Sequence, residues 1–110
     1  MASQTLTIEA TRESILTRAH DCVCGQREQD YGSPEASFGT IAEFWSTYLG
    51  QTLHAQDVAA MLALLKIARI TSGHYHLDNW IDLAGYAACG GEIEARAAAL
   101  EKCHGANSIE

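Results

Sequence analysis

Proline and aromatic residues are scarce in this sequence. It holds one proline in 110 residues, and aromatic residues make up 7% of the chain. All-β chains of this size need many turn residues, so little proline together with abundant alanine favours helices. No run of about 18 consecutive apolar residues occurs, and the first residues lack the basic start and apolar stretch of a signal peptide. We therefore expect an all-α, cytoplasmic protein that does not enter a membrane.

Basic charge is also in short supply. Seven lysines and arginines stand against fourteen acidic residues, giving a net charge of -7 and a pI near 5.1. Such a chain repels polyanions, so duplex DNA or RNA is not an expected partner. Four cysteines are present. In a cytosolic protein free thiols are the expected state.

Common metal and nucleophile motifs are absent as well. There is no CxxC, HExxH or GxSxG pattern, and Cys22 and Cys24 are two residues apart on an expected helix, where they point to nearly opposite sides. We therefore expect no metal held by cysteine or histidine, and no serine or cysteine nucleophile.

The length and hydrophobicity fit one globular domain. The chain of 110 residues is 47% hydrophobic, which is enough to form a core. We expect residues 1–110 to form a single helical domain, with an ordered core at about 9–103 and a frayed tail at 104–110.

Apolar periodicity predicts four helices. Gly25 falls inside the first of them, and one interior glycine costs only about 1 kcal/mol relative to alanine, so the helix is expected to continue through it. Ser33 as N-cap and Pro34 at the first helical position mark the start of the second. The predicted ranges are 9–31, 34–49, 55–71 and 78–102.

Short connections between these helices favour an antiparallel four-helix bundle. The third helix carries apolar residues almost all round, as a central helix does. Ile15, Trp45 and Trp80 do not all fit one small core, so at least a homodimer is expected. Gly85, Gly90 and Gly91 within the last helix indicate close packing against another helix or subunit.

Two isolated cations are the most informative feature. Lys66 and Arg69 are the only lysine or arginine residues between Glu28 and Ala95, and they share one face of the most apolar helix. Because a buried cation is costly unless paired, both are expected to meet acids or an anionic ligand. Asp78 and Asp82, one turn apart at the start of the next helix, are the expected acids.

Two interpretations of this cluster remain open. It is either an internal salt-bridge cluster that fixes helix register, or a polar pocket in which Lys66 and Arg69 bind phosphate oxygens. In the pocket, Asp78 and Asp82 orient the cations, contact a sugar hydroxyl or hold Mg²⁺.

A second cluster ends the first predicted helix. Arg27, Asp30 and Tyr31 are three and four residues apart, so they converge where the chain turns. The cluster is either a capped helix end or a site in which Arg27 reaches phosphate and Tyr31 stacks on a base. Tyr86 lies one turn beyond Asp82 on the same face and is either a core residue or a ligand contact.

These clusters together resemble a known family. The order Arg27-x-x-Asp30-Tyr31-Gly32-Ser33-Pro34, Asp57-Val58-Ala59, Lys66-x-x-Arg69 and Asp78-Asn79-Trp80-Ile81-Asp82-Leu83-Ala84-Gly85-Tyr86 resembles small all-α proteins of phages and prophages, over about residues 12–95. That family is similar to phage nucleotide-modification-associated domains. It more remotely resembles the all-α nucleoside triphosphate pyrophosphohydrolases of the MazG and dUTPase type.

The catalytic motifs of those hydrolases are missing here. They present EExxE and ExxD acids that bind Mg²⁺, whereas the second predicted helix has the single acid Glu43 at the corresponding place. If Mg²⁺ binds at all, the available ligands are Asp57, Asp78 and Asp82. The resemblance therefore implies a retained nucleotide site more than a retained reaction, and no required cofactor.

Three hypotheses follow for function. The first is a phage-type homo-oligomer that holds or sequesters a nucleotide or cyclic nucleotide signal in the host cytoplasm, antagonising antiviral signalling. The second is a Mg²⁺-dependent nucleotide pyrophosphohydrolase, and the third is a protein-binding accessory factor. The ligand-binding candidates under the first are Arg27, Asp30, Tyr31, Trp45, Lys66, Arg69, Asp78, Asn79, Trp80, Asp82 and Tyr86.

Overall fold

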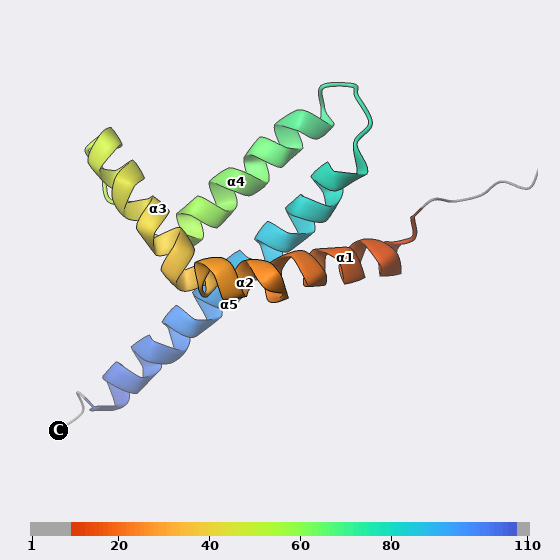
Figure 1. The fold of residues 1–110 in the computed structure, drawn as a ribbon. Coiled ribbons are helices and arrows are strands. Elements are labelled where there is room, and N and C mark those ends of the chain that lie inside the picture. Colours follow the sequence, from red (N-terminus) through yellow and green to blue (C-terminus); the bar gives the residue numbers. More distant parts are fainter. Residues whose placement is uncertain (1–9, 108–110) are drawn as a thin grey trace, which may run out of the picture.

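The structure, a computed structural model, describes residues 10–107, with side chains described up to His104. Within this part the chain is all-helical and contains no strand. No helix in it is both long and apolar enough to cross a bilayer. The helices are α1 (Arg12–Cys24), α2 (Gln26–Tyr31), α3 (Pro34–Leu49), α4 (Ala55–Ile70) and α5 (Leu77–Asn107) (Figure 1).

The first predicted helix is two helices. α1 begins after Thr11, which forms a capping box with Ser14, and not at Glu9, which lies outside the described residues. Gly25 ends α1 and starts α2, so the expectation of an uninterrupted helix was wrong. A Cβ atom at Gly25 would lie 2.6 Å from the Asp21 carbonyl oxygen, which shows that the chain turns here through a space open only to glycine.

α3 has the predicted bounds. The Ser33 hydroxyl accepts a hydrogen bond from the Ala36 N–H at 3.3 Å, and Pro34 occupies the first turn. Gly50 ends the helix in the left-handed conformation, with φ 68°. The Glu35 carboxylate in the first turn lies 3.1 Å from Arg96 Nη1, which ties α3 to α5.

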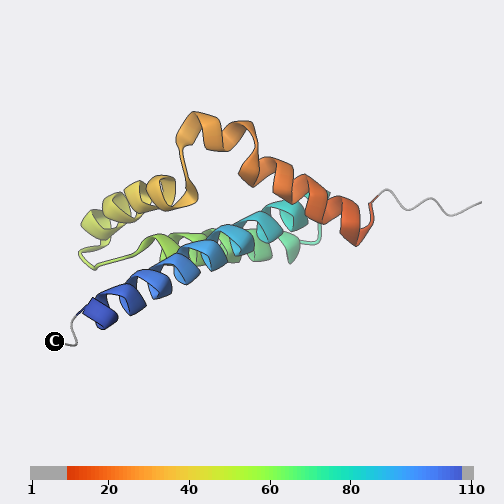
Figure 2. The ribbon, with the colours of Figure 1, turned by 90° about the horizontal axis from the view of Figure 1, so that it is seen from below.

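α4 and α5 form an antiparallel hairpin (Figures 1 and 2). Two contacts fix its register: Lys66 meets Asp82, and the Ala59 methyl group approaches Gly90. α5 runs past the predicted end at Lys102 as far as Asn107, so the tail expected to fray from 104 is helical up to that residue. Residues 108–110 lie outside the described part.

α5, not α4, is the central helix. It contacts α1, α3 and α4, and its buried residues include Ile81, Cys89 and Ile93. α1, α2 and α3 lie on one side of the hairpin (Figure 2). α4 therefore buries one face, with Val58 and Ala59, and leaves the other open, contrary to its predicted central place. Exposed large apolar residues on α4 are Met61, Leu64, Leu65 and Ile67.

Candidate functional site: two hollows that meet at Asp82

Two hollows lie along one face of α5 and share Asp82. We call them the aromatic pocket and the polar cleft. The residues lining the aromatic pocket are Cys22, Val23, Arg27, Glu28, Tyr31, Gly32, Pro34, Ser37, Phe38, Ile81, Asp82, Gly85, Tyr86 and Cys89. The residues lining the polar cleft are Lys66, Arg69, Ser72, His74, His76, Asp78, Asn79 and Asp82.

The spacing of residues on α5 explains why the hollows adjoin. Asp78, Asp82 and Tyr86 follow one another at four-residue steps, so their side chains project from the same face, about 6 Å apart along the axis. Asp78 lies in the cleft, Tyr86 in the pocket and Asp82 between them. One face of α5 thus carries a row of side chains that begins with two carboxylates and ends with an aromatic ring.

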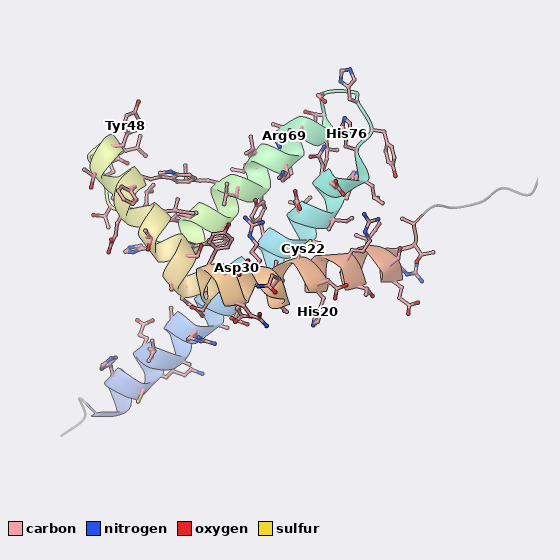
Figure 3. The ribbon with its side chains drawn as sticks, viewed as in Figure 1. His20, Cys22, Asp30, Tyr48, Arg69 and His76 are labelled. Atoms are coloured by element: carbon pink, nitrogen blue, oxygen red, sulfur yellow. The ribbon has the colours of Figure 1, made fainter. Side chains whose placement is uncertain are left out.

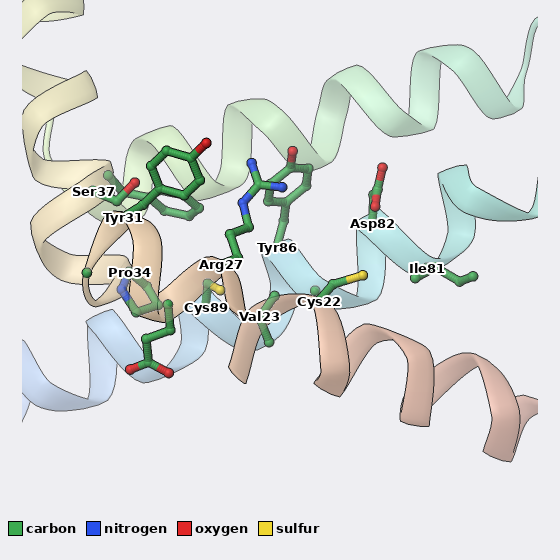
Figure 4. A pocket seen from close by; sticks show the side chains of 14 residues that line it. Cys22, Val23, Arg27, Tyr31, Pro34, Ser37, Ile81, Asp82, Tyr86 and Cys89 are labelled. Carbon is green, nitrogen blue, oxygen red and sulfur yellow. The ribbon is translucent and has the colours of Figure 1, made fainter. Parts of the chain in front are cut away.

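The aromatic pocket is a small cavity of about 80 Å³ between α1, α2, α3 and α5. The rings of Phe38 and Tyr86 are tilted by 50°, with centroids 6.3 Å apart. The Arg27 guanidinium lies 5.9 Å from the centre of the Tyr31 ring, within range of a cation–π interaction. Figure 4 shows Arg27 and Tyr86 side by side, both pointing into the space between α2, α4 and α5.

The turns on either side of α2 place Arg27 and Tyr31 at the pocket. The chain changes direction at Gly25, and Gly32 ends α2 with φ 83°, which L side chains rarely adopt. Tyr31 remains 68% exposed, so its ring borders the opening of the pocket and leaves a face free for contact.

The polar cleft, of about 490 Å³, lies where the α4–α5 hairpin turns. Lys66 Nζ is 2.9 Å from Asp82 Oδ2, and the lysine side chain is 11% exposed against 37% for the aspartate. Arg69 is exposed, and no carboxylate of the described residues lies within 4.0 Å of it, so only one of the two cations has the acid predicted for it. Figure 3 shows Arg69 and His76 at the same end of the hairpin.

Asp78 has a different partner from the one predicted. Its Oδ1 lies 3.7 Å from Nη2 of Arg18 on α1, and both side chains are largely exposed. Arg18 was not a predicted partner of Asp78. The distance between residues 18 and 78 along the chain explains this, because only the crossing of α1 over α5 brings the two together.

The remaining predicted residues divide between the hollows and the outer surface. Asn79 is buried and lines the cleft. Asp30 is exposed and accepts a hydrogen bond from Gln26 Nε2 at 2.8 Å, within α2. Trp80 is 48% exposed and lines a further hollow that shares His74, His76 and Asn79 with the cleft. Trp45 lines neither the pocket nor the cleft. Asp30 and Trp45 are therefore not brought to the joined site, and Trp80 lies next to the cleft without lining it.

Asp57 is not brought together with Asp78 and Asp82. Its carboxylate accepts a hydrogen bond from the His54 N–H at 2.8 Å and caps α4. Lys66 marks the level of Asp82, and Asp57 lies nine positions before it, about 13 Å away along the axis. The structure therefore does not gather the three aspartates at one place, and no group of three metal-binding side chains occurs in the part of the chain that the structure describes.

The structure adds residues that sequence reasoning missed. Phe38, His74 and His76 were not among the predicted site residues, yet Phe38 lines the pocket and the two histidines line the cleft. Cys22 and Cys89 also line the pocket, and burial, with Glu92 nearby, raises the pKa of the Cys89 thiol. For the cleft, the sequence did hold a signal: His74 and His76 lie only eight and ten residues after Lys66, in the short connection between the two helices.

Comparison with known proteins places the chain in a family. The family described as "Domain of unknown function (DUF6378)" matches residues 14–94, which include both hollows. The chain belongs to this family. No solved structure matches.

Two proteins of mycobacteriophages are similar to this chain. The Gene 55 protein of Mycobacterium phage L5 is 47% identical over 75 residues, covering 67% of this chain and 48% of its own length. The Gene 55 protein of Mycobacterium phage D29 is 43% identical over 77 residues, covering 70% of this chain and 51% of its own. The chain thus spans about half the length of these curated relatives.

Proposed function

We propose that this DUF6378 chain is a nucleotide-binding module. The observation that carries the proposal is the junction of an aromatic pocket with a cleft that contains Arg69, a guanidinium without a carboxylate partner among the described residues. Rings provide stacking surfaces for a base, and guanidinium groups bind phosphate oxygens as a fork. An internal salt-bridge cluster accounts for Lys66 and Asp82 but not for Arg69 beside an open cleft.

The proposed role is binding without turnover. The described residues include no cluster of three metal-ligating side chains, and the two carboxylates in the cleft already face cations, Asp82 with Lys66 and Asp78 with Arg18. This favours holding a ligand over Mg²⁺-assisted hydrolysis. With mycobacteriophage relatives, sequestration of a nucleotide or cyclic nucleotide signal in the host cytoplasm, against host antiviral signalling, is the biological role we propose.

We also propose that a second copy covers the open face of α4 and completes a four-helix, MazG-like bundle. Val58 is the only large side chain in the described residues that is less than 2% exposed, so one copy alone has a thin core. Met61, Leu64 and Leu65 form a stripe at helical spacing without a charged residue among them. An uncharged face can meet its own copy without repulsion, although the whole chain carries a net charge of -7.

Light scattering coupled to size exclusion tests the second copy. The wild-type chain is expected at twice its monomer mass, and Leu64→Glu is expected to shift it to monomer. The matched control is Leu16→Glu. Leu16 is an exposed leucine on α1, away from the face of α4, so this variant should leave the dimer intact. A wild-type monomer, or equal effects of the two variants, would contradict this assignment.

Calorimetry tests the nucleotide function itself. The full chain is titrated with nucleoside mono-, di- and triphosphates and cyclic nucleotides, with and without Mg²⁺, and the mixture is analysed by mass spectrometry. Heat with recovery of intact ligand supports the binding module. Release of a monophosphate supports the pyrophosphohydrolase instead, and absence of heat from every nucleotide supports a protein-binding accessory factor.

A further inference from the structure

The charges along the joined site nearly cancel. In the polar cleft, Lys66 and Arg69 stand against Asp78 and Asp82, and in the aromatic pocket Arg27 stands against Glu28. Arg18, which does not line the cleft, pairs with Asp78, so that carboxylate has a cationic partner other than Arg69. In the polar cleft, Arg69 is therefore the one cation without a carboxylate partner among the described residues. Arg27, in the aromatic pocket, also has no carboxylate of these residues within 4.0 Å, but its guanidinium lies over the Tyr31 ring.

This balance limits the charge that the ligand can carry. A triphosphate holds several negative charges close together, and in the cleft it would meet two carboxylates, Asp78 and Asp82, and a single unpaired cation, Arg69. Placing unmatched like charges together in a partly desolvated cleft is unfavourable. A single phosphate group matches the available guanidinium.

The two hollows also differ in what they offer to each part of a ligand. The polar cleft has no phenylalanine, tyrosine or tryptophan among its own lining residues. The rings nearest to it, Tyr75 and Trp80, line the hollow on its far side from Asp82, and they are 70% and 48% exposed. The aromatic pocket brings Tyr31, Phe38 and Tyr86 together, and its one arginine lies over Tyr31. The base thus fits the pocket and the phosphate fits the cleft, with Asp82 between them.

We infer that the ligand is a nucleoside with a single phosphate group, as a monoester or a cyclic diester. Its base enters the aromatic pocket, a ribose hydroxyl donates to Asp82, and its phosphate binds Arg69 at the mouth of the polar cleft. This inference rests on the proposed nucleotide-binding function and adds the phosphate number and the direction of binding. Arg27, which the sequence suggested as a phosphate ligand, belongs to the base end.

Calorimetry of the full chain with four sets of probes tests the phosphate number. The sets are the five nucleoside 5′-monophosphates, the 3′,5′-cyclic monophosphates, the matching nucleosides, and the matching triphosphates without Mg²⁺. The expected result is that at least one compound with a single phosphate binds at least about tenfold more tightly than its nucleoside and its triphosphate. Tighter binding of the triphosphate overturns the inference while leaving the nucleotide function in place. The monoester and cyclic sets decide between the two forms of the phosphate.

Two variants test the direction of binding. Arg69→Met is expected to weaken the single-phosphate ligand by about tenfold or more and to leave the nucleoside unchanged. Tyr31→Ser is expected to weaken ligand and nucleoside alike, by about fivefold or more. Both side chains are exposed, so both variants should fold. Arg69→Lys, which keeps the charge but loses the fork, should restore binding only in part.

Arg12→Met is the matched control, because Arg12 is exposed at the start of α1 and lines neither hollow. Its affinity should equal that of the wild type. If Arg69→Met binds as well as Arg12→Met, the direction of binding is wrong although a nucleotide still binds. If no nucleotide of any set binds, the proposed function itself fails.

Discussion

The two ends of the α4–α5 hairpin are built in opposite ways. At one end small residues meet, and a Cβ atom added to Gly90 would lie 3.1 Å from the Ala59 Cβ atom. At the other end the long side chain of Lys66 reaches Asp82 across the interface, and the polar cleft opens beside the pair. We refer to these as the closed end and the polar end.

The comparison shows how one pair of helices can pack closely at one end and leave a hollow at the other. Small residues let helix backbones approach, whereas a charged pair needs room and access to water for its remaining hydrogen-bonding atoms. Apolar periodicity is similar at both ends. The residue types at the contacts, not the periodicity, decide which end is filled and which is hollow.

The largest expected effect comes from forcing the closed end apart. Gly90→Leu places a branched side chain against Ala59, where even a Cβ atom is tight. Overpacking of this kind is expected to lower the free energy of unfolding by about 3 kcal/mol. Urea unfolding followed by circular dichroism measures the change. An unchanged midpoint would show that the helices are not in contact at this end.

At the polar end, removing one charge is expected to cost less. Asp82→Asn leaves Lys66 nearly buried without a carboxylate and should lower the free energy of unfolding by about 2 kcal/mol, less than for a fully buried pair because Asp82 is 37% exposed. Lys66→Met should cost under about 1 kcal/mol, since methionine fills the apolar path of the lysine stem and Asp82 can be hydrated. Thermal melts of both variants that gave the reverse order would contradict this account.

Gly91 lies next to Gly90 at the closed end but faces open space, so it separates the effect of close packing from that of helix propensity. No atom lies within 4 Å of a Cβ atom placed there. Gly91→Ala should therefore raise the free energy of unfolding by about 0.8 kcal/mol through helix propensity alone. The measurement is the same urea titration, and a loss of stability would reveal a contact on this side of α5 that one copy of the chain does not show.

Arg69 should have the smallest effect on stability. Because it is exposed and pairs with no carboxylate of the described residues, Arg69→Met is expected to change the free energy of unfolding by less than about 0.5 kcal/mol. A loss of several kcal/mol in a thermal melt would mean that an acid depends on this guanidinium, and Arg69 would then belong to a structural cluster.

Much of the fold follows from local signals in the sequence. Ser33, Pro34 and Gly50 fix the bounds of α3 because each acts on backbone next to it in the chain. The break at Gly25 was missed because helix propensity alone tolerates one glycine, and it does not reveal that the backbone here comes too close to the Asp21 carbonyl oxygen for any side chain. The central place of α5 depends on which helices cross it, and periodicity carries no information about that.

The site was predictable where its residues lie on adjacent helices in a fixed register. Lys66 and Asp82 pair as expected, because a short connection makes α4 and α5 antiparallel neighbours. Arg18 and Phe38 come from helices earlier in the chain, and their approach to α5 depends on crossing angles that spacing does not encode. Asp57 was misplaced for a simpler reason, since antiparallel pairing carries it away from Asp82.

The turn at Gly25 sets the orientation of α2, which lines one side of the aromatic pocket. Arg27 and Tyr31 stand on a six-residue helix that glycines bound at both ends, while Asp82 and Tyr86 stand on a helix of 31 residues. Relatives can therefore widen or narrow the pocket by changing the angle of this short segment, without altering the face of α5 that borders the cleft. Under the proposed function, we expect differences in ligand size within the family to follow from changes in residues 25–32.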